Sequence, residues 1–120
     1  MVKASEIPIR WRTKRATADR LLGDAGRLML DQWLEHTREV AAELGWPLKR
    51  IKVEYYQDEE FTDWEYILLV MDFDCPSDEA GKIFWEDYIK GVVGARQKEL
   101  TGPEKEIFVT MIHYELESNP

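Results

Sequence analysis

The order of alternating and helix-periodic segments constrains the fold of this 120-residue chain more than any other feature. Apolar and polar residues alternate over residues 6–12, which is typical of a half-buried strand. A helical spacing of apolar residues follows; it begins between Thr17 and Asp24 and continues to Leu44. Gly45 then favours a left-handed cap, so the first helix is expected to end there.

The second half of the chain carries two further strand patterns, a helical pattern and a last strand pattern. Residues 49–57 and 64–74 read as two strands joined by a hairpin whose tip is the turn-forming stretch 58–63. A second helix is predicted over roughly residues 78–100, because apolar residues recur there every three or four positions. Residues 106–117 are predicted as the last strand.

The resulting order is strand, helix, strand, strand, helix, strand. This order predicts an α+β fold with the βαββαβ arrangement of ferredoxin-like domains. Such a fold is a four-stranded antiparallel sheet with two helices on one face and with the first and third strands in the centre. If residues 6–12 are not a strand, the expected fold is a three-stranded sheet with two helices. The length predicts a single domain over residues 1–120.

Charge is unevenly distributed in this acidic chain, whose net charge is −8. Residues 1–20 carry six basic and two acidic groups (6 − 2 = +4), and the remaining hundred carry 10 basic and 22 acidic groups (10 − 22 = −12). We interpret residues 1–20 as a basic N-terminal arm that includes the first strand and binds its own acidic body; a neighbouring subunit or a phosphate-bearing partner are the alternatives. The acidic body disfavours nucleic acid and anionic membranes.

Cysteine usage and hydropathy predict a cytoplasmic protein. Cys75 is the only cysteine, so the chain cannot form an internal disulfide, as is usual in a reducing compartment. We expect it to be a buried, unreactive core residue. The start of the sequence lacks the apolar stretch of a signal peptide, and the longest apolar run, 66–71, is too short to span a bilayer. The scarcity of Asn and Gln beside 33% charged residues points to a thermophilic source.

The strand at residues 64–74 is apolar on both faces, although helices cover only one face of a ferredoxin-like sheet. If Ile67, Leu69, Met71 and Phe73 face the helices, the open face carries Trp64, Tyr66, Leu68 and Val70. An apolar patch of this kind is larger than a soluble monomer normally exposes, so we expect a second copy, an apolar ligand or the N-terminal arm to cover it.

These features predict a homo-oligomeric interaction or regulatory module that associates through the open sheet face, rather than an enzyme, and we expect no cofactor. Symmetric homodimers are the commonest oligomers, which favours a second copy as the partner. One alternative is a dimer that binds a small apolar or anionic ligand in a pocket on this face and is catalytic if acid–base groups line it. Another alternative is a subunit of a hetero-complex.

The candidate residues of a ligand or interface site lie on the predicted open face. His113 becomes the best acid–base candidate if it lies there, because histidine titrates near neutral pH; among apolar residues it would instead be structural. The full candidate set is Arg10, Arg12, Trp64, Tyr66, Leu68, Val70 and His113.

A metal site is conceivable at Asp72 and Asp74, which alternation places on one strand face. Two carboxylates can hold Mg²⁺ when a substrate phosphate completes the coordination. The competing interpretation is charge pairing with Arg10, Arg12 or a lysine at the end of the sheet; the predicted fold places the two arginines on a neighbouring strand. No spacing in the sequence matches a zinc site or a phosphate-binding loop.

Overall fold

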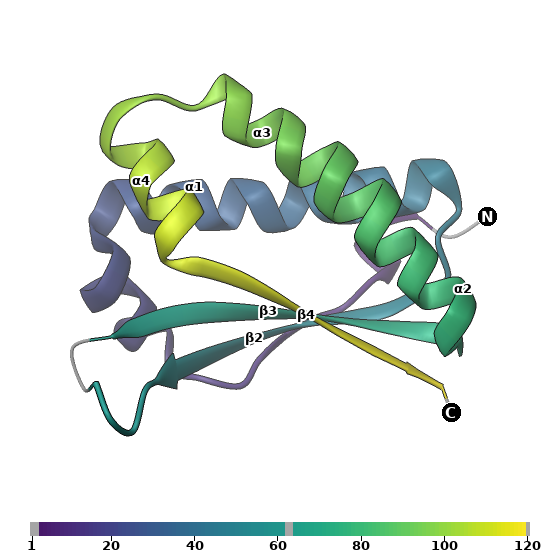
Figure 1. The fold of residues 1–120 in the computed structure, drawn as a ribbon, viewed down its shortest axis with the longest axis horizontal. Helices are drawn as coiled ribbons and strands as arrows, with labels where there is room; N and C mark the ends of the chain where they lie inside the picture. Colours follow the sequence, from purple (N-terminus) through teal and green to yellow (C-terminus); the bar gives the residue numbers. More distant parts are fainter. Residues whose placement is uncertain (1–2, 62–63, 120) are drawn as a thin grey trace.

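A four-stranded mixed sheet with all its helices on one face forms the fold (Figure 1). The computed structural model describes residues 3–61 and 64–119. The first half contains η1 (Ala4–Glu6), β1 (Ile9–Trp11), α1 (Arg15–Leu44) and β2 (Leu48–Gln57). The second half contains β3 (Glu65–Pro76), α2 (Ser77–Lys82), η2 (Ile83–Val93), α3 (Gly94–Glu99), α4 (Gly102–Thr110) and β4 (Ile112–Asn119). Part of the predicted hairpin tip, residues 62–63, lies outside the described residues.

The sheet order follows the chain order, β1-β2-β3-β4, which shows that the prediction of an antiparallel ferredoxin-like sheet is wrong. β1 pairs with β2 in parallel and β4 pairs with β3 in parallel, while β2 and β3 form the predicted antiparallel hairpin. The physical reason lies in the length of β1. A ferredoxin-like sheet places its first strand in the centre, but β1 has only three residues and cannot bridge two strands of ten and twelve. It therefore lies at an edge.

The first helix begins earlier than the sequence suggests, at Arg15, and the helical path kinks at Gly23. Gly23 has a φ of 74° and a ψ of 175°, a backbone conformation that is unfavourable for residues other than glycine. The end is as predicted: Gly45 adopts a left-handed φ of 67° and caps α1. Although α1 is long, no helix among the described residues is both long and apolar enough to cross a membrane.

The second predicted helix is confirmed as one continuous helical rod from α2 through η2 to α3. The residues at both joints, Ile83 and Gly94, keep right-handed helical backbone angles. The middle section η2 is a π-helix, in which each N–H bonds five residues back instead of four. The rod crosses the sheet diagonally on the same face as α1 (Figure 1).

The last predicted strand, residues 106–117, is wrong in its first part, which belongs to the helix α4. Gly102 has a φ of 63° and Pro103 occupies the first turn of α4, where a missing N–H costs nothing. The Thr-Gly-Pro stretch that ends the second helix therefore also starts the next one. The chain extends again only at Ile112, and β4 joins the edge of β3.

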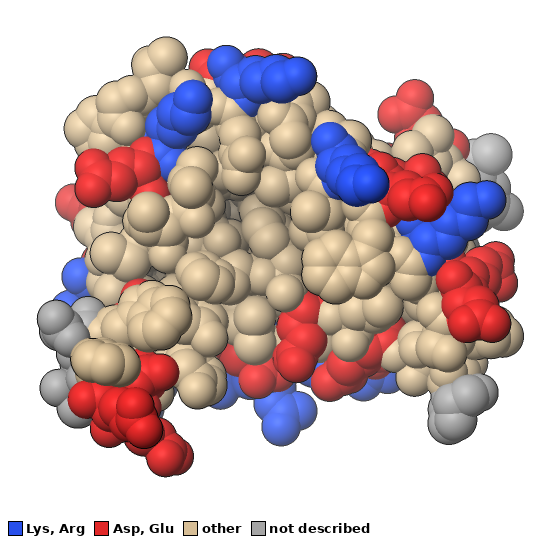
Figure 2. Space-filling model, viewed as in Figure 1, with Lys and Arg blue, Asp and Glu red and all other residues tan. Residues whose placement is uncertain are grey.

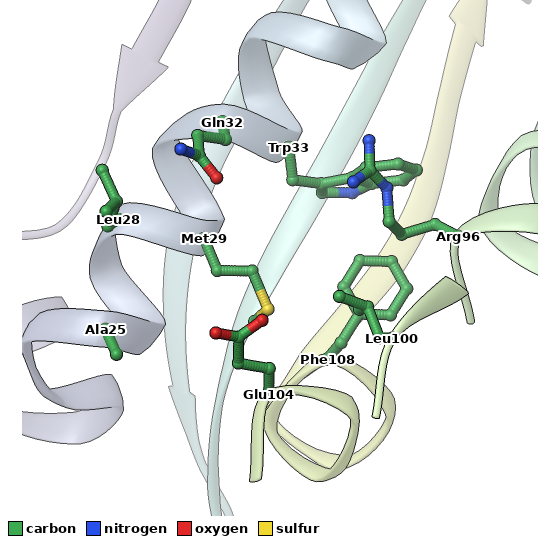
Figure 3. Close-up of a pocket in the computed structure, with 9 residues that line it drawn as sticks. All are labelled: Ala25, Leu28, Met29, Gln32, Trp33, Arg96, Leu100, Glu104 and Phe108. Carbon is green, nitrogen blue, oxygen red and sulfur yellow. The ribbon is translucent and has the colours of Figure 1, made fainter. Parts of the chain in front are cut away.

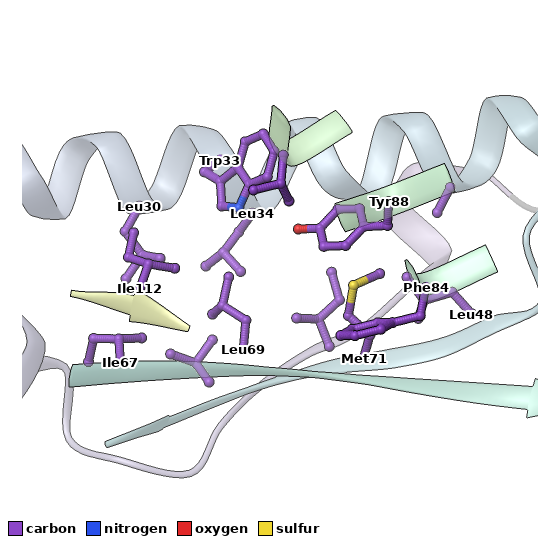
Figure 4. Close-up of a cluster of buried hydrophobic side chains, with 14 of the residues drawn as sticks. Leu30, Trp33, Leu34, Leu48, Ile67, Leu69, Met71, Phe84, Tyr88 and Ile112 are labelled. Carbon is purple, nitrogen blue, oxygen red and sulfur yellow. The ribbon is translucent and has the colours of Figure 1, made fainter. Parts of the chain in front are cut away.

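The core lies between the helices and the sheet (Figure 4). The predicted inward residues of β3 are confirmed, since each is at most 1% exposed. Each such side chain contributes about 1.5–3 kcal/mol through its burial. The helices complete this layer with Leu30, Trp33, Leu34, Phe84 and Tyr88, and β4 adds Ile112.

The basic N-terminal arm packs against its own body. Ile7 is buried in the core, and the Nε of Arg38 donates a hydrogen bond to the carbonyl of Ala4 at 3.0 Å. The guanidinium of Arg27 lies 4.5 Å from the centre of the Trp11 ring, close enough for a cation–π contact. The arm therefore has intramolecular partners in this structure.

Candidate functional site

The open face of the sheet carries the predicted side chains, but it is not a continuous apolar surface. Tyr66, Leu68 and Val70 alternate with the buried residues of β3 and so point away from the helices. Their neighbours on β2 are mostly charged, because Lys52 pairs with Val70 and Glu54 pairs with Leu68. The apolar stripe of β3 is thus flanked by polar side chains.

An ion pair bridges the middle of this face. The Nζ of Lys52 on β2 lies 2.6 Å from the Oε2 of Glu117 on β4, with β3 between the two strands. To reach Glu117, the aliphatic stem of Lys52 crosses β3 close to its register partner Val70. Val70 is fully buried although it faces away from the helices. The surface therefore needs no second copy to cover Val70.

Asp72 and Asp74 have separate partners. Asp72 lies 3.3 Å from the Nε of Arg50, and Asp74 accepts a hydrogen bond from the side-chain amide of Asn119 at 3.0 Å. Within residues 3–61 and 64–119, no group of three potential metal-binding side chains occurs. Charge pairing is the observed arrangement of Asp72, although the partner is Arg50 and not a residue of β1.

The predicted proximity of the β1 arginines to these aspartates is wrong. Arg10 pairs in register with Lys52, so the whole of β2 separates it from β3. The backbone N–H of Arg12 bonds the carbonyl of Val53, which places Arg12 just beyond the end of β1 at the same edge. Both side chains are exposed and lie away from His113 on the opposite edge of the sheet.

An aromatic cluster occupies the hairpin end of the open face; it consists of Tyr56, Trp64, Tyr66 and His113. The Tyr66 ring stacks between Tyr56, at a centroid distance of 4.9 Å, and His113, at 4.0 Å. Trp64 is tilted against Tyr66 at 6.2 Å and is 51% exposed. Tyr66 is therefore covered on both ring faces within the cluster, whereas Tyr56, at 43%, and Trp64 remain exposed.

The polar groups around this cluster favour a structural role. Burial raises the pKa of Tyr66, and the nearby Tyr56, Asp58 and Glu115 raise it further. The Nε2 of His113 lies 3.0 Å from the backbone carbonyl of Thr110, within hydrogen-bond distance. This contact and the stacking on Tyr66 orient the imidazole and join β4 to the end of α4.

Cys75 is buried, as predicted. Burial raises the pKa of its thiol, and the carboxylates of Glu79 and Asp74 raise it further. At neutral pH the side chain is therefore the protonated thiol, which is a poor nucleophile. This residue completes the core at the end of β3.

A second surface, which we call the β4 groove, lies between the helical rod, α4 and β4. It encloses about 280 Å³. Figure 2 shows this side of the molecule, where uncharged residues surround a central hollow and charged residues lie mainly at the margins. Trp85 is 57% exposed and Val109 is 46% exposed, so large apolar side chains face solvent at the groove. The groove is lined by Trp85, Ile89, Val93, Gln97, Phe108, Val109, Ile112, His113 and Tyr114.

The groove borders a strand edge with free backbone groups. β4 is the last strand of the sheet, and within residues 3–61 and 64–119 it pairs with β3 alone. The N–H of Ile67 bonds the carbonyl of Met111 at 2.8 Å, and in a parallel ladder Ile67 bonds on both sides of its register partner Ile112. The backbone groups of Met111 and His113 thus point toward β3. Those of Ile112, Tyr114 and Leu116 point outward along the edge.

Polar side chains lie in the core beneath the groove. The hydroxyls of Thr37 and Tyr88 are 2.9 Å apart and form a buried hydrogen bond. The Tyr114 hydroxyl is also buried but has no hydrogen-bond partner of ordinary geometry among the described residues, and the same holds for the indole nitrogen of Trp33. Burial raises the pKa of both tyrosines well above the usual range. These hydroxyls therefore stay neutral and cannot serve as bases at physiological pH.

The β4 groove was not among the predicted sites, although the sequence contains a signal for it. Trp85, Ile89 and Val93 recur every four residues and form a second apolar stripe beside the one that contains Phe84 and Tyr88. One helix packed on one sheet buries a single stripe, so the second stripe indicates a further apolar surface.

Comparisons with known proteins give no relative from which a role could be transferred. No family model, no curated protein and no solved structure matches this chain.

Proposed function

We propose that this protein is a homo-oligomeric interaction module that associates through the β4 edge and the β4 groove. The observation that carries the proposal is the combination of an unpaired strand edge with an adjoining apolar groove and an exposed Trp85. Edge strands template pairing with other chains unless they are protected. Apolar surface beside such an edge adds the main favourable term of association.

The surface differs from the one that the sequence suggested. The middle of the open sheet face is bridged by Lys52 and Glu117, whereas the β4 groove exposes large apolar side chains. Since aromatic residues dominate the energetics of protein interfaces, Trp85 is the expected anchor.

Charges favour one register for a symmetric pair of β4 strands. In an antiparallel pairing centred on Tyr114, His113 lies opposite Glu115 of the second copy. Pairings centred on Glu115 or Leu116 instead oppose two carboxylates, which is destabilising. The register centred on Tyr114 also joins the outward backbone groups of Ile112 to those of Leu116. A two-fold symmetric dimer of this kind closes on itself and leaves no further β4 edge.

Sedimentation and light scattering over a concentration series test the proposal. The monomer mass is 14.2 kDa, so we expect a species of twice that mass at high concentration. Because apolar contacts carry the association, added salt should not dissociate it; salt screens the repulsion between two chains of net charge −8.

Substitution separates this surface from other exposed apolar residues. Trp85→Lys should give a folded monomer, because the side chain is exposed. Leu44→Lys is the matched control, since Leu44 is 60% exposed at the end of α1 and lies outside the groove. A monomer at every concentration, or a dimer that survives Trp85→Lys, would rule out the proposed interface. A monomeric protein that aggregates when it is expressed alone would instead favour the hetero-complex, in which a different protein covers the β4 groove.

A further inference from the structure

A separate pocket lies between α1, α3 and α4 and shares only Phe108 with the β4 groove (Figure 3). It encloses about 190 Å³. Met29, Trp33, Leu100 and Phe108 give it an apolar interior, in which the Trp33 and Phe108 rings meet edge to face at 5.0 Å. Met29, Trp33 and Phe108 are buried core residues, so the pocket floor is rigid.

The pocket also carries one cationic group in a fixed position. The guanidinium of Arg96 lies 5.5 Å from the centre of the Trp33 ring, a cation–π contact that orients it. Its ion pair with Glu99 is long, at 3.9 Å. A guanidinium has five N–H donors, and this one contact leaves most of them available to a carboxylate.

The same pocket carries one anionic group on another helix. Glu104 lies in the first turn of α4. Across the ranges that the structure describes, it forms no ion pair, and Figure 3 shows it standing apart from Arg96. Gln32 of α1 adds a neutral amide that can donate and accept hydrogen bonds.

We propose that this pocket binds a small apolar α-amino acid in its zwitterionic form. Arg96 binds the carboxylate, Glu104 binds the ammonium group, and the side chain of the ligand contacts Leu28 and Leu100 above the buried Met29 and Phe108. A simple carboxylic acid would leave Glu104 without a partner, and a simple amine would do the same to Arg96. A group of each sign around an apolar interior is complementary to both ends of a zwitterion.

The volume restricts the size of the ligand. Pockets for drug-sized molecules enclose about 300–1,000 Å³. An apolar cavity of about 150 Å³ accommodates a benzene ring. The 190 Å³ of this pocket therefore suits amino acids of the size of leucine or methionine, with the polar head group at the rim.

Calorimetry and thermal shift of the full chain test this proposal with L-leucine and L-methionine at up to millimolar concentrations. We expect saturable binding and a rise in melting temperature, because a ligand of the native state stabilises it. Isocaproate and isoamylamine, which lack the ammonium group and the carboxylate of leucine respectively, should each bind at least about tenfold more weakly, since one charged hydrogen bond is lost.

Two variants assign the head group contacts. Arg96→Met should weaken leucine and isocaproate alike by about tenfold or more, whereas Glu104→Gln should weaken leucine but not isocaproate. Lys98→Met and Glu106→Gln are matched controls on the same helices outside the pocket and should bind leucine as the wild type does. Absence of binding by the folded wild type, equal binding of leucine and isocaproate, or equal losses in the controls would each overturn the proposal. None of these outcomes depends on self-association, which the Trp85→Lys variant tests separately.

Discussion

Lys52 and Glu117 meet at 2.6 Å across the central strand β3, although 65 residues separate them in the chain. The ion pair ties β2 to β4, two strands that share no backbone ladder. Val70, the register partner of Lys52, is fully buried on the face that no helix covers. We infer that the aliphatic stem of Lys52 covers Val70, as an apolar side chain would, while its charged end pairs with Glu117.

This arrangement predicts different effects for two substitutions of Lys52. Lys52→Met keeps an aliphatic cover over Val70 and loses only the partly exposed ion pair, which should cost at most about 1 kcal/mol. Lys52→Ala also uncovers Val70 and should cost about 1–2 kcal/mol. Urea unfolding measures both. Equal losses in the two variants would show that the stem of Lys52 contributes no cover.

The buried hydrogen bond between Thr37 and Tyr88 predicts strong coupling. Thr37→Val leaves the Tyr88 hydroxyl without its partner in an apolar region, which should cost about 1–3 kcal/mol. Tyr88→Phe strands the threonine hydroxyl in the same way. The double variant should lose about 0.5–3 kcal/mol less than the sum of the single losses. A double-mutant cycle from denaturant unfolding measures this coupling, and additive losses would contradict it.

Close contact between α1 and α4 predicts that a side chain at position 26, in place of Gly26, lowers the stability of the protein. A Cβ at this position would lie 3.0 Å from the Cβ of Leu22 and 3.3 Å from the Cδ1 of Ile107. Gly26→Ala should therefore destabilise the protein by about 1–3 kcal/mol despite the higher helix propensity of alanine. Gly81→Ala is the matched control in α2, where a Cβ meets no atom within 4 Å. It should be neutral or stabilising by up to about 1 kcal/mol.

Glu65 predicts a loss of stability in acid. The Tyr55 hydroxyl donates a hydrogen bond to this carboxylate at 2.5 Å, and Arg20 lies 3.3 Å from it. The hydrogen bond from Tyr55, and after it Arg20, hold the pKa of Glu65 below its usual value of 4.5. Because the folded state has the lower pKa, the stabilisation is present above pH 4.5 and disappears as the pH falls through the folded pKa.

Replacing the carboxylate checks that sign. Glu65→Gln should be less stable than the wild type at neutral pH, and the difference should shrink as the pH falls below 4.5. Glu59→Gln, in the exposed turn beyond β2, controls for the change in net charge. Urea unfolding at several pH values provides the measurement. A difference that is constant with pH would mean that the charge of Glu65 does not contribute.

The elements with strong periodicity could be predicted from sequence, because burial of one face dictates that periodicity. The inward residues of β3 and the long helical rod follow directly from it. The strand order could not be predicted in this way. It depends on β1 being only three residues long, and the alternation over residues 6–12 extends further than the strand itself.

Residues 106–111 show why short segments are ambiguous. Ile107 and Met111 are four positions apart on one helix face, yet the run is also apolar on both faces, as a buried strand would be. Only the backbone at Gly102 and Pro103 favours the helix. The candidate interface moved from the open sheet face to the β4 groove for a related reason. Lys52 and Glu117, which pair across the open face beside Val70, are distant in the chain, and no local sequence pattern reveals such a pair.

The sheet order β1-β2-β3-β4 has a consequence for how the sheet assembles. In the central hairpin, a short turn connects β2 to β3. Each outer strand is instead connected to its neighbour through helices, α1 for β1 and α2 to α4 for β4. Local pairing closes with less loss of chain entropy, so we expect the β2–β3 hairpin to form early and the outer strands to dock afterwards. Amide hydrogens of the hairpin should then exchange slowest and those of β1 fastest. The β4 edge, the proposed interface, would be completed late in folding, so association would select chains that are already folded.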